Sequence, residues 1–437
     1  MSELAFLSAV ELLDGYKQKA FSPVDVARAC LTRIERRGAA LNAFVHVDHE
    51  GAIAAARASE ERYRRGTPDG PLDGVPVAIK DLILTRGMPT RRGSKALDAS
   101  GPWETDAPVT ARLREANAVI LGKTSTPEMG WKAVTDSPLL GVARNPWNPA
   151  MTPGGSSGGA GIAAATGMGA LHVGTDGGGS IRIPASFCGV FGYRPTWGDL
   201  RCSGVREAAG SLDTLGLLAR SVDDLALYRD VLLGVEPQAV PEHTGALRVG
   251  FCRTHVWPQV EPHTQQLLED AAQRLARAGL QVSEVELPAH FARLTDVHLA
   301  ISSFEFSRNF TYEIEHHWEK ISTTLRENRL KSGLECSFER YSEARLFAAQ
   351  CRREFADVVE NYDVLLTASA TGEAPVGLNA TGNANNCLIW TTLHVPSVTM
   401  PVFKGPHGLP VGAQIIGKAN GDRALFAAAH RIYRALA

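Results

Sequence analysis

Several features that would direct a function are scarce or missing in this sequence of 437 residues. Its seven cysteines form no C-x-x-C pair, a pattern that fits reduced thiols in the cytoplasm and gives no zinc signature. The N-terminus has acidic residues inside its apolar run and no cleavage-like site, and no run of about 18 apolar residues follows. The formal net charge of −2 argues against nucleic acid or an anionic membrane as partner. We therefore expect a soluble, cytoplasmic protein.

Helical and strand patterns alternate along the chain, which predicts an α/β fold with a parallel or mixed sheet between helices. Residues 1–66 have a helical pattern, in which Ser22 is the expected N-cap of a helix that begins at Pro23. The stretch 306–330 is expected to be helical and mostly exposed, and a last helix is expected from Asp422. Length alone suggests two or three domains.

Glycine is concentrated in one part of the chain, where it fills 11 of the 26 positions from Gly154 to Gly179. Such a density destabilises regular elements, so the backbone there needs positive φ angles or close approach to a bound group. Two serine-containing loops lie in this part, "TPGGSSGG" (Thr152–Gly159) and "TDGGGS" (Thr175–Ser180).

Four short patterns match familiar motifs without the context that those motifs need. "VAIK" (77–80) lacks the other kinase motifs, "HVGTDGGGS" lacks the spacing of phosphate-binding loops, and "EHHWE" (315–319) lacks metalloprotease spacing. "GSSGG" (155–159) fits a nucleophile elbow centred on Ser157, but three prolines precede it where a strand is required. An esterase of the α/β-hydrolase type that uses Ser157 therefore stays as an alternative only.

The polar residues around the two glycine loops each have an ordinary structural explanation. Lys80 fits a solvated strand end, Ser156 and Ser157 fit helix N-caps, and Ser180 fits a turn. None of these explains the glycines on both sides. A serine nucleophile with a desolvated, neutral lysine as base does explain them, because successive glycine N–H groups form a nest for an oxyanion.

The segment "PGGSSGGAGIAAATGMGALHVGTDGGGSIRIPASFCGVFGYRPT", from Pro153 to Thr196, resembles the signature of the amidase signature family of serine hydrolases. "GGSSGG" and "GGGSIRIPA" lie 24 residues apart, serine to serine, and the flanking "PLDGVPVAIKD", "SLDTLGLLARSVDDLAL", "HVPSVTMPV" and "GLPVGAQIIG" also match. The resemblance covers roughly residues 10 to 432 and is similar to the shorter bacterial amidases, including malonamidase-like members.

The resemblance implies a Ser–cis-Ser–Lys triad in which Ser180 is the nucleophile, Ser156 the bridging serine and Lys80 the base. The peptide bond before Ser156 is then cis. Further roles implied by the family pattern are oxyanion-hole donors at Gly177, Gly178 and Gly179, and supporting positions at Ser157, Asp176 and Arg182. The sequence departs from the family at Gly177, where a larger residue is usual, and at Arg194, where lysine is common.

The resemblance also implies an amidase that hydrolyses a small or medium carboxylic amide through an acyl-enzyme, without metal or cofactor. Its expected fold is one large α/β/α domain over residues 1–437, with a central mixed sheet covered by helices. Within it we expect a helical N-terminal segment (1–66), a catalytic core (67–233) and a part that completes the sheet and the substrate pocket (246–437). The pocket residues implied in this way are Met129, Gly130, Trp131, Asn386, Ile389 and Trp390.

Two points about partners stay open. The amidase component of a tRNA-dependent amidotransferase would carry the same triad and pass ammonia to a partner, so it is the alternative to a free-standing amidase. A homodimer is an expectation by analogy with relatives alone.

Overall fold

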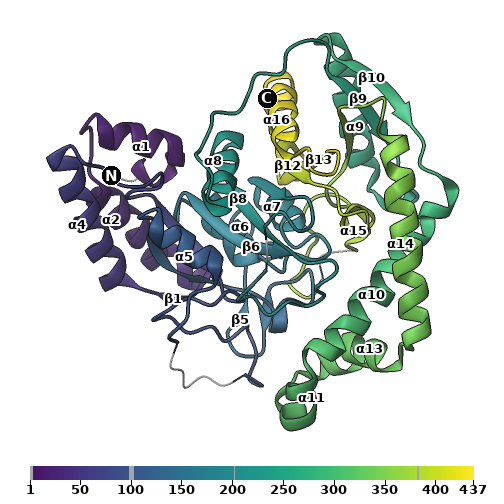
Figure 1. Cartoon of the computed structure of the whole chain (residues 1–437), viewed down its shortest axis with the longest axis horizontal. Coiled ribbons are helices and arrows are strands. Elements are labelled where there is room, and N and C mark those ends of the chain that lie inside the picture. The colour runs from purple at the N-terminus through teal and green to yellow at the C-terminus, as the bar shows by residue number, and fades with distance from the viewer. Residues whose placement is uncertain (1–2, 98–102, 201, 381–382) are drawn as a thin grey trace.

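The computed structural model describes residues 3–97, 103–200, 202–380 and 383–437, and it is built around an eleven-stranded sheet (Figure 1). The strand order across the sheet is β1-β3-β2-β6-β8-β7-β12-β13-β11-β9-β10. These strands are β1 (Phe44–Val47), β2 (Pro76–Lys80), β3 (Val119–Thr124), β6 (Leu171–Asp176), β7 (Phe191–Arg194), β8 (Thr214–Ala219), β9 (Arg248–Cys252), β10 (Gln281–Val285), β11 (Val364–Ala368), β12 (Ser397–Lys404) and β13 (Pro410–Ile416). A separate ribbon pairs β4 (Asp136–Ser137) with β5 (Gly141–Val142).

The sheet is mixed, as the sequence predicts. β2 runs parallel to both β3 and β6, whereas β8, β7, β12 and β13 alternate in direction. β11, β9 and β10 are again mutually parallel. β2, β6 and β8 are buried along their whole length, which is expected for strands whose two faces are both covered.

Helices flank the sheet, which confirms the predicted fold class. The α-helices are α1 (Ala9–Lys17), α2 (Pro23–Arg33), α3 (Ala39–Leu41), α4 (His49–Arg65), α5 (Pro108–Glu115), α6 (Gly158–Ala165), α7 (Arg182–Cys188), α8 (Val222–Leu233), α9 (Pro262–Arg277), α10 (Leu294–Asn309), α11 (Thr311–His317), α12 (Thr323–Leu325), α13 (Lys331–Glu335), α14 (Phe338–Val358), α15 (Asn385–Thr392) and α16 (Asp422–Leu436). Shorter helical turns are η1 (Leu4–Phe6), η2 (Ile34–Gly38), η3 (Glu128–Gly130), η4 (Trp257–Gln259), η5 (Ala289–Arg293), η6 (Trp318–Lys320) and η7 (Arg326–Leu330). Within the described ranges, no helix combines the length and the apolar character needed to cross a membrane.

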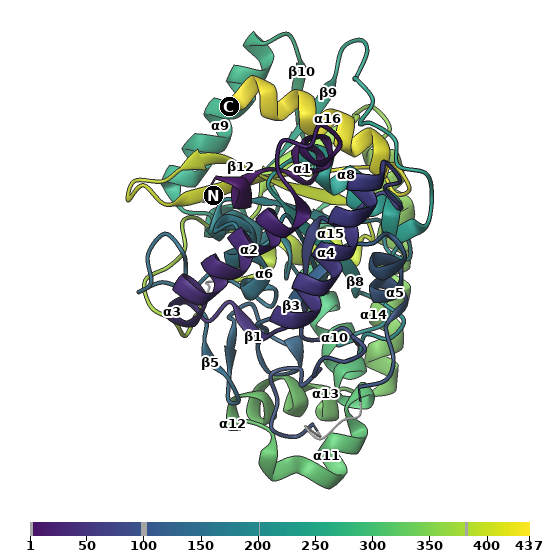
Figure 2. The same cartoon turned by 90° about the vertical axis from the view of Figure 1, so that its left-hand side faces the viewer.

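Two groups of helices pack on the sheet. α16 contacts α8, α9 and β12, and Figure 2 shows α16 and α9 together at the top of the molecule. α6 and α7 contact each other and pack on β6 and β7 respectively. The two glycine-rich loops precede α6 and α7, so this pair of helices fixes where both loops lie.

The N-terminal segment is mostly helical, as the sequence predicts, and Ser22 caps α2 by accepting a hydrogen bond from the backbone N–H of Asp25. The prediction is wrong at β1, which pairs antiparallel with β3 at the edge of the sheet. This strand has four half-buried residues between two helices, too few to interrupt the helical pattern of the sequence.

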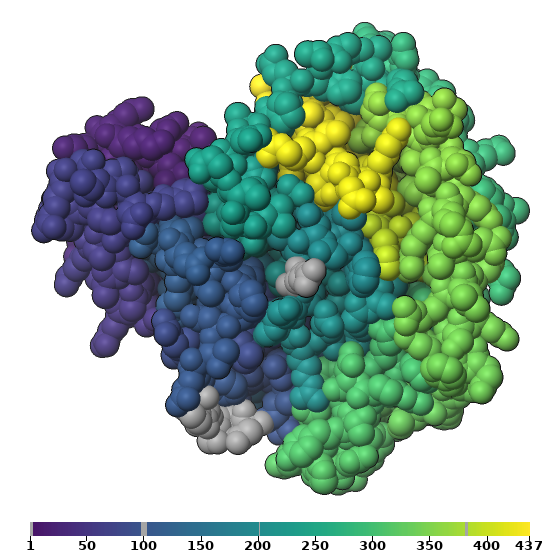
Figure 3. Space-filling model, viewed as in Figure 1, coloured from purple at the N-terminus to yellow at the C-terminus, as the bar shows by residue number. Residues whose placement is uncertain are grey.

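The stretch 306–330 is helical but broken into α11, η6, α12 and η7 after the end of α10. The expectation of mostly exposed residues is wrong for Phe306, Phe310, Leu325 and Leu330, because these side chains form one apolar cluster with Met129. Figure 3 shows this part of the chain at the lower edge of the molecule, away from the N-terminal segment at the upper left.

Candidate active site

Lys80 is the last residue of β2, and its ammonium-bearing end is buried at the centre of a group of hydroxyls. Its Nζ lies 2.7 Å from Ser156 Oγ, 2.9 Å from Ser157 Oγ and 2.9 Å from Thr175 Oγ1. The pairing of β2 with β6 brings Thr175 to this point. Lys80 is therefore not a solvated strand end.

Burial lowers the pKa of Lys80 from its ordinary 10.5 to about 7, because the charged form loses its hydration. The carboxylates of Asp213 and Asp176 act in the opposite direction and favour the charged form. In the described part of the chain, neither carboxylate lies within 4.0 Å of Lys80 Nζ, so neither forms an ion pair with it. An amine with such a pKa can accept a proton at neutral pH.

The first glycine loop presents Ser156 and Ser157 to Lys80 from the start of α6. The peptide bond between Gly155 and Ser156 is cis, as the family pattern predicts. Ser157 stands at the N-terminus of α6, but its hydroxyl does not cap the helix. It donates instead to the backbone oxygen of Thr175 at 3.2 Å, so the N-cap explanation does not apply to this serine.

The nucleophile elbow is a wrong interpretation of "GSSGG". Ser157 follows a loop rather than a strand, and its side chain is fully buried. Its backbone N–H donates to the carbonyl oxygen of Ser180 at 3.1 Å, which ties the two glycine loops together.

The second glycine loop leaves β6 at Asp176, which is fully buried and holds the loop by hydrogen bonds. Its carboxylate accepts from the N–H groups of Gly179 (2.8 Å) and Ile181 (3.0 Å), and from Arg182 Nη2 (2.8 Å) and Nε (3.0 Å). Burial alone would raise the pKa of Asp176, but the Arg182 guanidinium and these N–H groups hold it well below its usual value. Arg182 also donates to Thr391 Oγ1 at 2.6 Å, so the loop is fixed to α15.

The three glycines before Ser180 are not equivalent. Gly179 has a φ of 110°, a conformation that favours glycine, and its N–H is directed at Asp176. Among the hydrogen bonds of the described residues, none engages the N–H of Gly177 or Gly178. Of the three glycines, Gly177 and Gly178 are therefore the two whose N–H groups an oxyanion could use.

A side chain at Gly177 would require the carboxylate of Asp213 to move. A Cβ at this position would overlap Asp213 Oδ1. The same carboxylate accepts hydrogen bonds from the N–H groups of Ala208 (2.6 Å) and Ala209 (3.0 Å), and burial raises its pKa to about 7. His298 Nε2 lies 2.6 Å from the carbonyl oxygen of Gly177, and burial lowers the pKa of this histidine to about 3, so a neutral ring donates to that oxygen.

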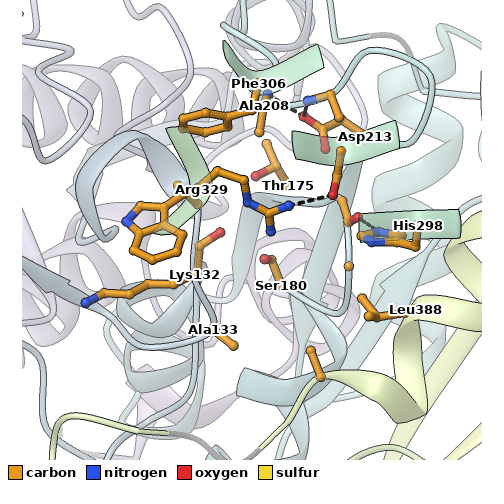
Figure 4. Close-up of a pocket in the computed structure, with 18 of the residues that line it drawn as sticks. Lys132, Ala133, Thr175, Ser180, Ala208, Asp213, His298, Phe306, Arg329 and Leu388 are labelled. Carbon is orange, nitrogen blue, oxygen red and sulfur yellow. Dashed lines mark hydrogen bonds between the residues drawn. The ribbon is translucent and has the colours of Figure 1, made fainter. Parts of the chain in front are cut away.

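A pocket of about 430 Å³ opens in front of these loops. Ser156, Ser180, Gly177 and Gly178 line it together, and Figure 4 shows Ser180 facing its interior. Apolar side chains form much of its wall, namely Leu82, Trp131, Val134, Val205, Phe306 and Leu388. No direct hydrogen bond between Ser156 and Ser180 is present among the described residues, although both reach the same cavity.

The six pocket residues implied by the resemblance divide into two groups. Gly130 and Trp131 line the pocket. Met129, Asn386, Ile389 and Trp390 do not line it and are buried behind it, where Ile389 and Trp390 belong to an apolar cluster with Phe355. From the same helix α15, Asn385 and Leu388 reach the cavity instead.

Sequence reasoning does not single out Thr175, Asp213, His298 or Arg329, all of which line the pocket. Asp213 stands in "SLDTLGLLARSVDDLAL", which the sequence marks only as a segment that matches the family pattern. The local sequence around His298 and Arg329 carries no signal that could have found them. Both reach the site through tertiary packing of the helices around α10.

Comparison with known proteins agrees with the family resemblance of the sequence. The family model for amidases matches residues 25–426. A glutamyl-tRNA(Gln) amidotransferase subunit from Chloroflexus aggregans is 33% identical over 97% of this chain and 95% of its own length. The 2-amino-5-chloromuconic acid deaminase of Comamonas testosteroni is 31% identical over 96% of this chain and 94% of its own length.

Solved structures agree in fold over nearly the whole chain. A crystal structure of an amidase has a TM-score of 0.91 at 29% identity and covers 99% of this chain and 100% of its own. A bacterial aryl acylamidase has a TM-score of 0.87 at 25% identity and covers 98% of this chain and 96% of its own. With the family model matching most of its length, the chain belongs to the amidase signature family and is a hydrolase that acts on amide C–N bonds.

Proposed function

We propose that this amidase cleaves a small or medium carboxylic amide with Ser180 as nucleophile, Ser156 as proton bridge and Lys80 as base. The observation that carries the proposal is the contact of 2.7 Å between Lys80 Nζ and Ser156 Oγ in a buried site. A serine hydroxyl needs such a base before it can attack a carbonyl carbon.

The contacts around Lys80 are consistent with a neutral amine. Neutral Nζ has two N–H bonds and one lone pair for its three hydroxyl neighbours. Ser157 already donates its own hydrogen to Thr175 O, so it accepts from Nζ. If Thr175 Oγ1 accepts the second N–H, the lone pair is left for the hydroxyl hydrogen of Ser156, which is the direction that proton transfer requires.

The reaction then proceeds in two halves. Ser180 Oγ attacks the carbonyl carbon while its proton passes to Ser156, whose own proton passes to Lys80. The tetrahedral intermediate collapses when the C–N bond breaks and the proton returns through Ser156 to the departing nitrogen. Water adds to the remaining acyl-enzyme ester by the same proton path, which releases the acid and restores Ser180.

The developing oxyanion is held by the N–H groups of Gly177 and Gly178 in this proposal. The N–H of Gly179 already donates to Asp176, so this residue shapes the loop rather than adding a third donor. Each donor in such a site is worth about 3 kcal/mol of transition-state stabilisation. Asp176 and Arg182 support the donors because they fix the loop.

A fluorophosphonate probe followed by peptide mass spectrometry tests these roles. We expect the adduct on Ser180, and its loss in Ser180→Ala and in Lys80→Met. Ser221→Ala is the matched control, because Ser221 caps α8 outside the pocket. An adduct on Ser157, or unchanged labelling in Lys80→Met, would overturn the assignment.

A second candidate function rests on the similarity to the glutamyl-tRNA(Gln) amidotransferase subunit, which extends over nearly the whole chain. In that case the chain would act with partner proteins and release ammonia to them. Efficient hydrolysis of simple amides by the purified chain alone would contradict this role. Dependence of turnover on added partner proteins would support it.

A further inference from the structure

In the described part of the chain, the carbonyl oxygen of Gly177 has one hydrogen-bond donor, the ring of His298 at a distance of 2.6 Å from Nε2. Because a carbonyl oxygen can only accept, Nε2 carries the hydrogen. Nδ1 of the same ring is buried without a partner among the described residues, and burial lowers the pKa of the ring to about 3. The ring is therefore neutral at neutral pH. Figure 4 shows His298 at the wall of the cavity that Ser180 faces.

The carbonyl group of Gly177 belongs to the same peptide unit as the N–H group of Gly178. Among the described residues the cis peptide bond is Gly155–Ser156, so the bond between Gly177 and Gly178 is trans. In a trans unit the C=O and N–H groups point in opposite directions. With its oxygen held by His298 from α10, the unit directs the N–H of Gly178 away from that helix. The histidine therefore sets the direction of one of the two proposed oxyanion donors.

This peptide unit needs such a restraint, because a glycine stands on each side of it. Without Cβ atoms, rotation of the unit about its two flanking bonds meets few steric barriers. A half turn would put the C=O group of Gly177 in the place of the N–H group of Gly178, and a carbonyl oxygen repels an oxyanion. The hydrogen bond from His298 opposes that turn. It also polarises the peptide unit, which strengthens the N–H as a donor.

The ring of His298 is itself held in place by packing. It is 3% exposed, and a Cβ at Gly178 would lie 3.3 Å from His298 Cε1 and 3.0 Å from Leu388 Cδ2, so the loop packs closely against both side chains. Leu294 and Ile301, on the same helix, belong to two apolar clusters that also contain residues of α14. The restraint on the loop is therefore built into the fold before a substrate binds.

We propose that His298 is a positioning residue for amide cleavage, which holds the Gly177–Gly178 peptide unit so that the N–H of Gly178 donates to the oxyanion. The inference rests on the proposed function of Ser180 as nucleophile. It adds a residue from α10, far in sequence from the glycine-rich loops, that acts through the backbone and takes no part in proton transfer.

The rate at which a fluorophosphonate labels Ser180 measures this role without knowledge of the natural substrate. Ser180 Oγ bonds to phosphorus, fluoride leaves, and the phosphoryl oxygen takes the place of the oxyanion. The measured quantities are kinact, the limiting rate of labelling, and KI, the probe concentration at half of that rate. We expect His298→Leu to lower kinact about 10- to 1000-fold, between the loss of one hydrogen bond and the loss of a whole oxyanion donor. KI should change by less than about threefold, because leucine has nearly the volume of histidine.

Two amide variants separate the reach of the side chain from its packing. Glutamine carries an N–H group at about the distance of histidine Nε2, whereas asparagine is shorter. His298→Gln should therefore recover kinact to within about tenfold of the wild-type value, and His298→Asn should not. This pair decides the question even if His298→Leu does not fold, and the thermal midpoint of each variant checks its folding.

His394→Asn is the matched control. His394 Nε2 lies 2.7 Å from the backbone oxygen of Ser211, and burial lowers the pKa of this ring also to about 3, but His394 does not line the pocket. Asparagine tolerates the φ of 63° at this position. We expect kinact to stay within about twofold of the wild-type value, since the two sites are independent.

Three results would overturn the inference while Ser180 is still labelled. These are a wild-type kinact in His298→Leu, equal losses in His298→Gln and His298→Asn, or the same loss in His394→Asn. An unlabelled Ser180 in the wild-type protein is a different result, because it would refute the proposed function and this inference with it.

Discussion

Acidification should inactivate the enzyme by protonating Lys80, and the structure gives the expected size of the effect. With the pKa of Lys80 at about 7, roughly half of the molecules carry the neutral amine at about pH 7, one in about ten at pH 6 and one in about a hundred at pH 5. A lysine with the ordinary pKa of 10.5 would be neutral in only about one molecule in 3000 at pH 7. Burial therefore increases the neutral fraction of Lys80 at neutral pH by about a thousandfold.

The assay is kcat/KM for one uncharged amide over a range from about pH 5 to about pH 9, because kcat/KM reports the free enzyme. We expect a plateau on the alkaline side and a tenfold loss for each pH unit below about 6. An uncharged substrate removes any contribution from binding of a charged one. A profile that stays flat to about pH 5 would refute the role of Lys80 as the base.

The titration of Asp213 must be distinguished from that of Lys80, because burial raises the pKa of Asp213 to about 7, the same value as for Lys80. Its carboxylate favours the charged form of Lys80, so Asp213→Asn should lower the pKa of Lys80 and move the acid limb to lower pH. Disappearance of the limb in this variant would assign it to Asp213 instead.

The lowered pKa of Lys80 also affects the stability of the folded protein. The pKa of Lys80 is lower in the folded than in the unfolded chain. Its contribution to the free energy of unfolding is therefore most favourable above the unfolded pKa of 10.5, and it is lost as the pH falls toward about 7. At neutral pH the cost is about 4 kcal/mol. Lys80→Met removes this cost and three hydrogen bonds of about 1 kcal/mol each, so urea denaturation should show a small net gain, about 1 kcal/mol.

Two further substitutions test how the fold holds the site. Asp422→Ala removes a buried carboxylate that accepts from Tyr193 Oη (2.6 Å), Thr196 N (2.9 Å) and Thr196 Oγ1 (2.6 Å), so chemical denaturation should show a loss of about 3 kcal/mol; a change below about 1 kcal/mol would contradict this accounting. Gly159→Ala places a Cβ against the backbone of Ser125, where α6 packs on the end of β3, and should lower the thermal midpoint by several degrees together with activity. An unchanged midpoint would mean that α6 can move away without cost.

The parts of the site that depend on local sequence could be predicted, and the parts that depend on strand register could not. The two glycine loops and Lys80 carry their own signal, because glycine density and serine spacing are visible in the chain. Asp213 reaches Gly177 because β8 runs antiparallel to β6, with Asp176 opposite Thr214. Nothing in the sequence fixes that register in advance.

Helix orientation explains the difference between the expected and the observed pocket wall. α15 does approach the site, as the resemblance implies, but Asn385 and Leu388 face the cavity. Each residue turns the direction of the side chain by about 100°, so Trp390 points well away from Leu388 and into the core. The resemblance identified the segment, whereas identifying which of its side chains face the cavity required the tertiary structure.

The groups proposed for bond cleavage and one part of the pocket wall come from different stretches of the chain. Every group proposed for bond cleavage comes from the region between β2 and β8, whereas the pocket-lining residues His298, Phe306 and Arg329 come from the helices between η5 and α14. Those helices lie along one side of the molecule (Figure 1). Exchanging residues 289–358 between related amidases would therefore change this part of the pocket wall, and it would leave the oxyanion loop undisturbed only if His298, which contacts the carbonyl oxygen of Gly177, were kept.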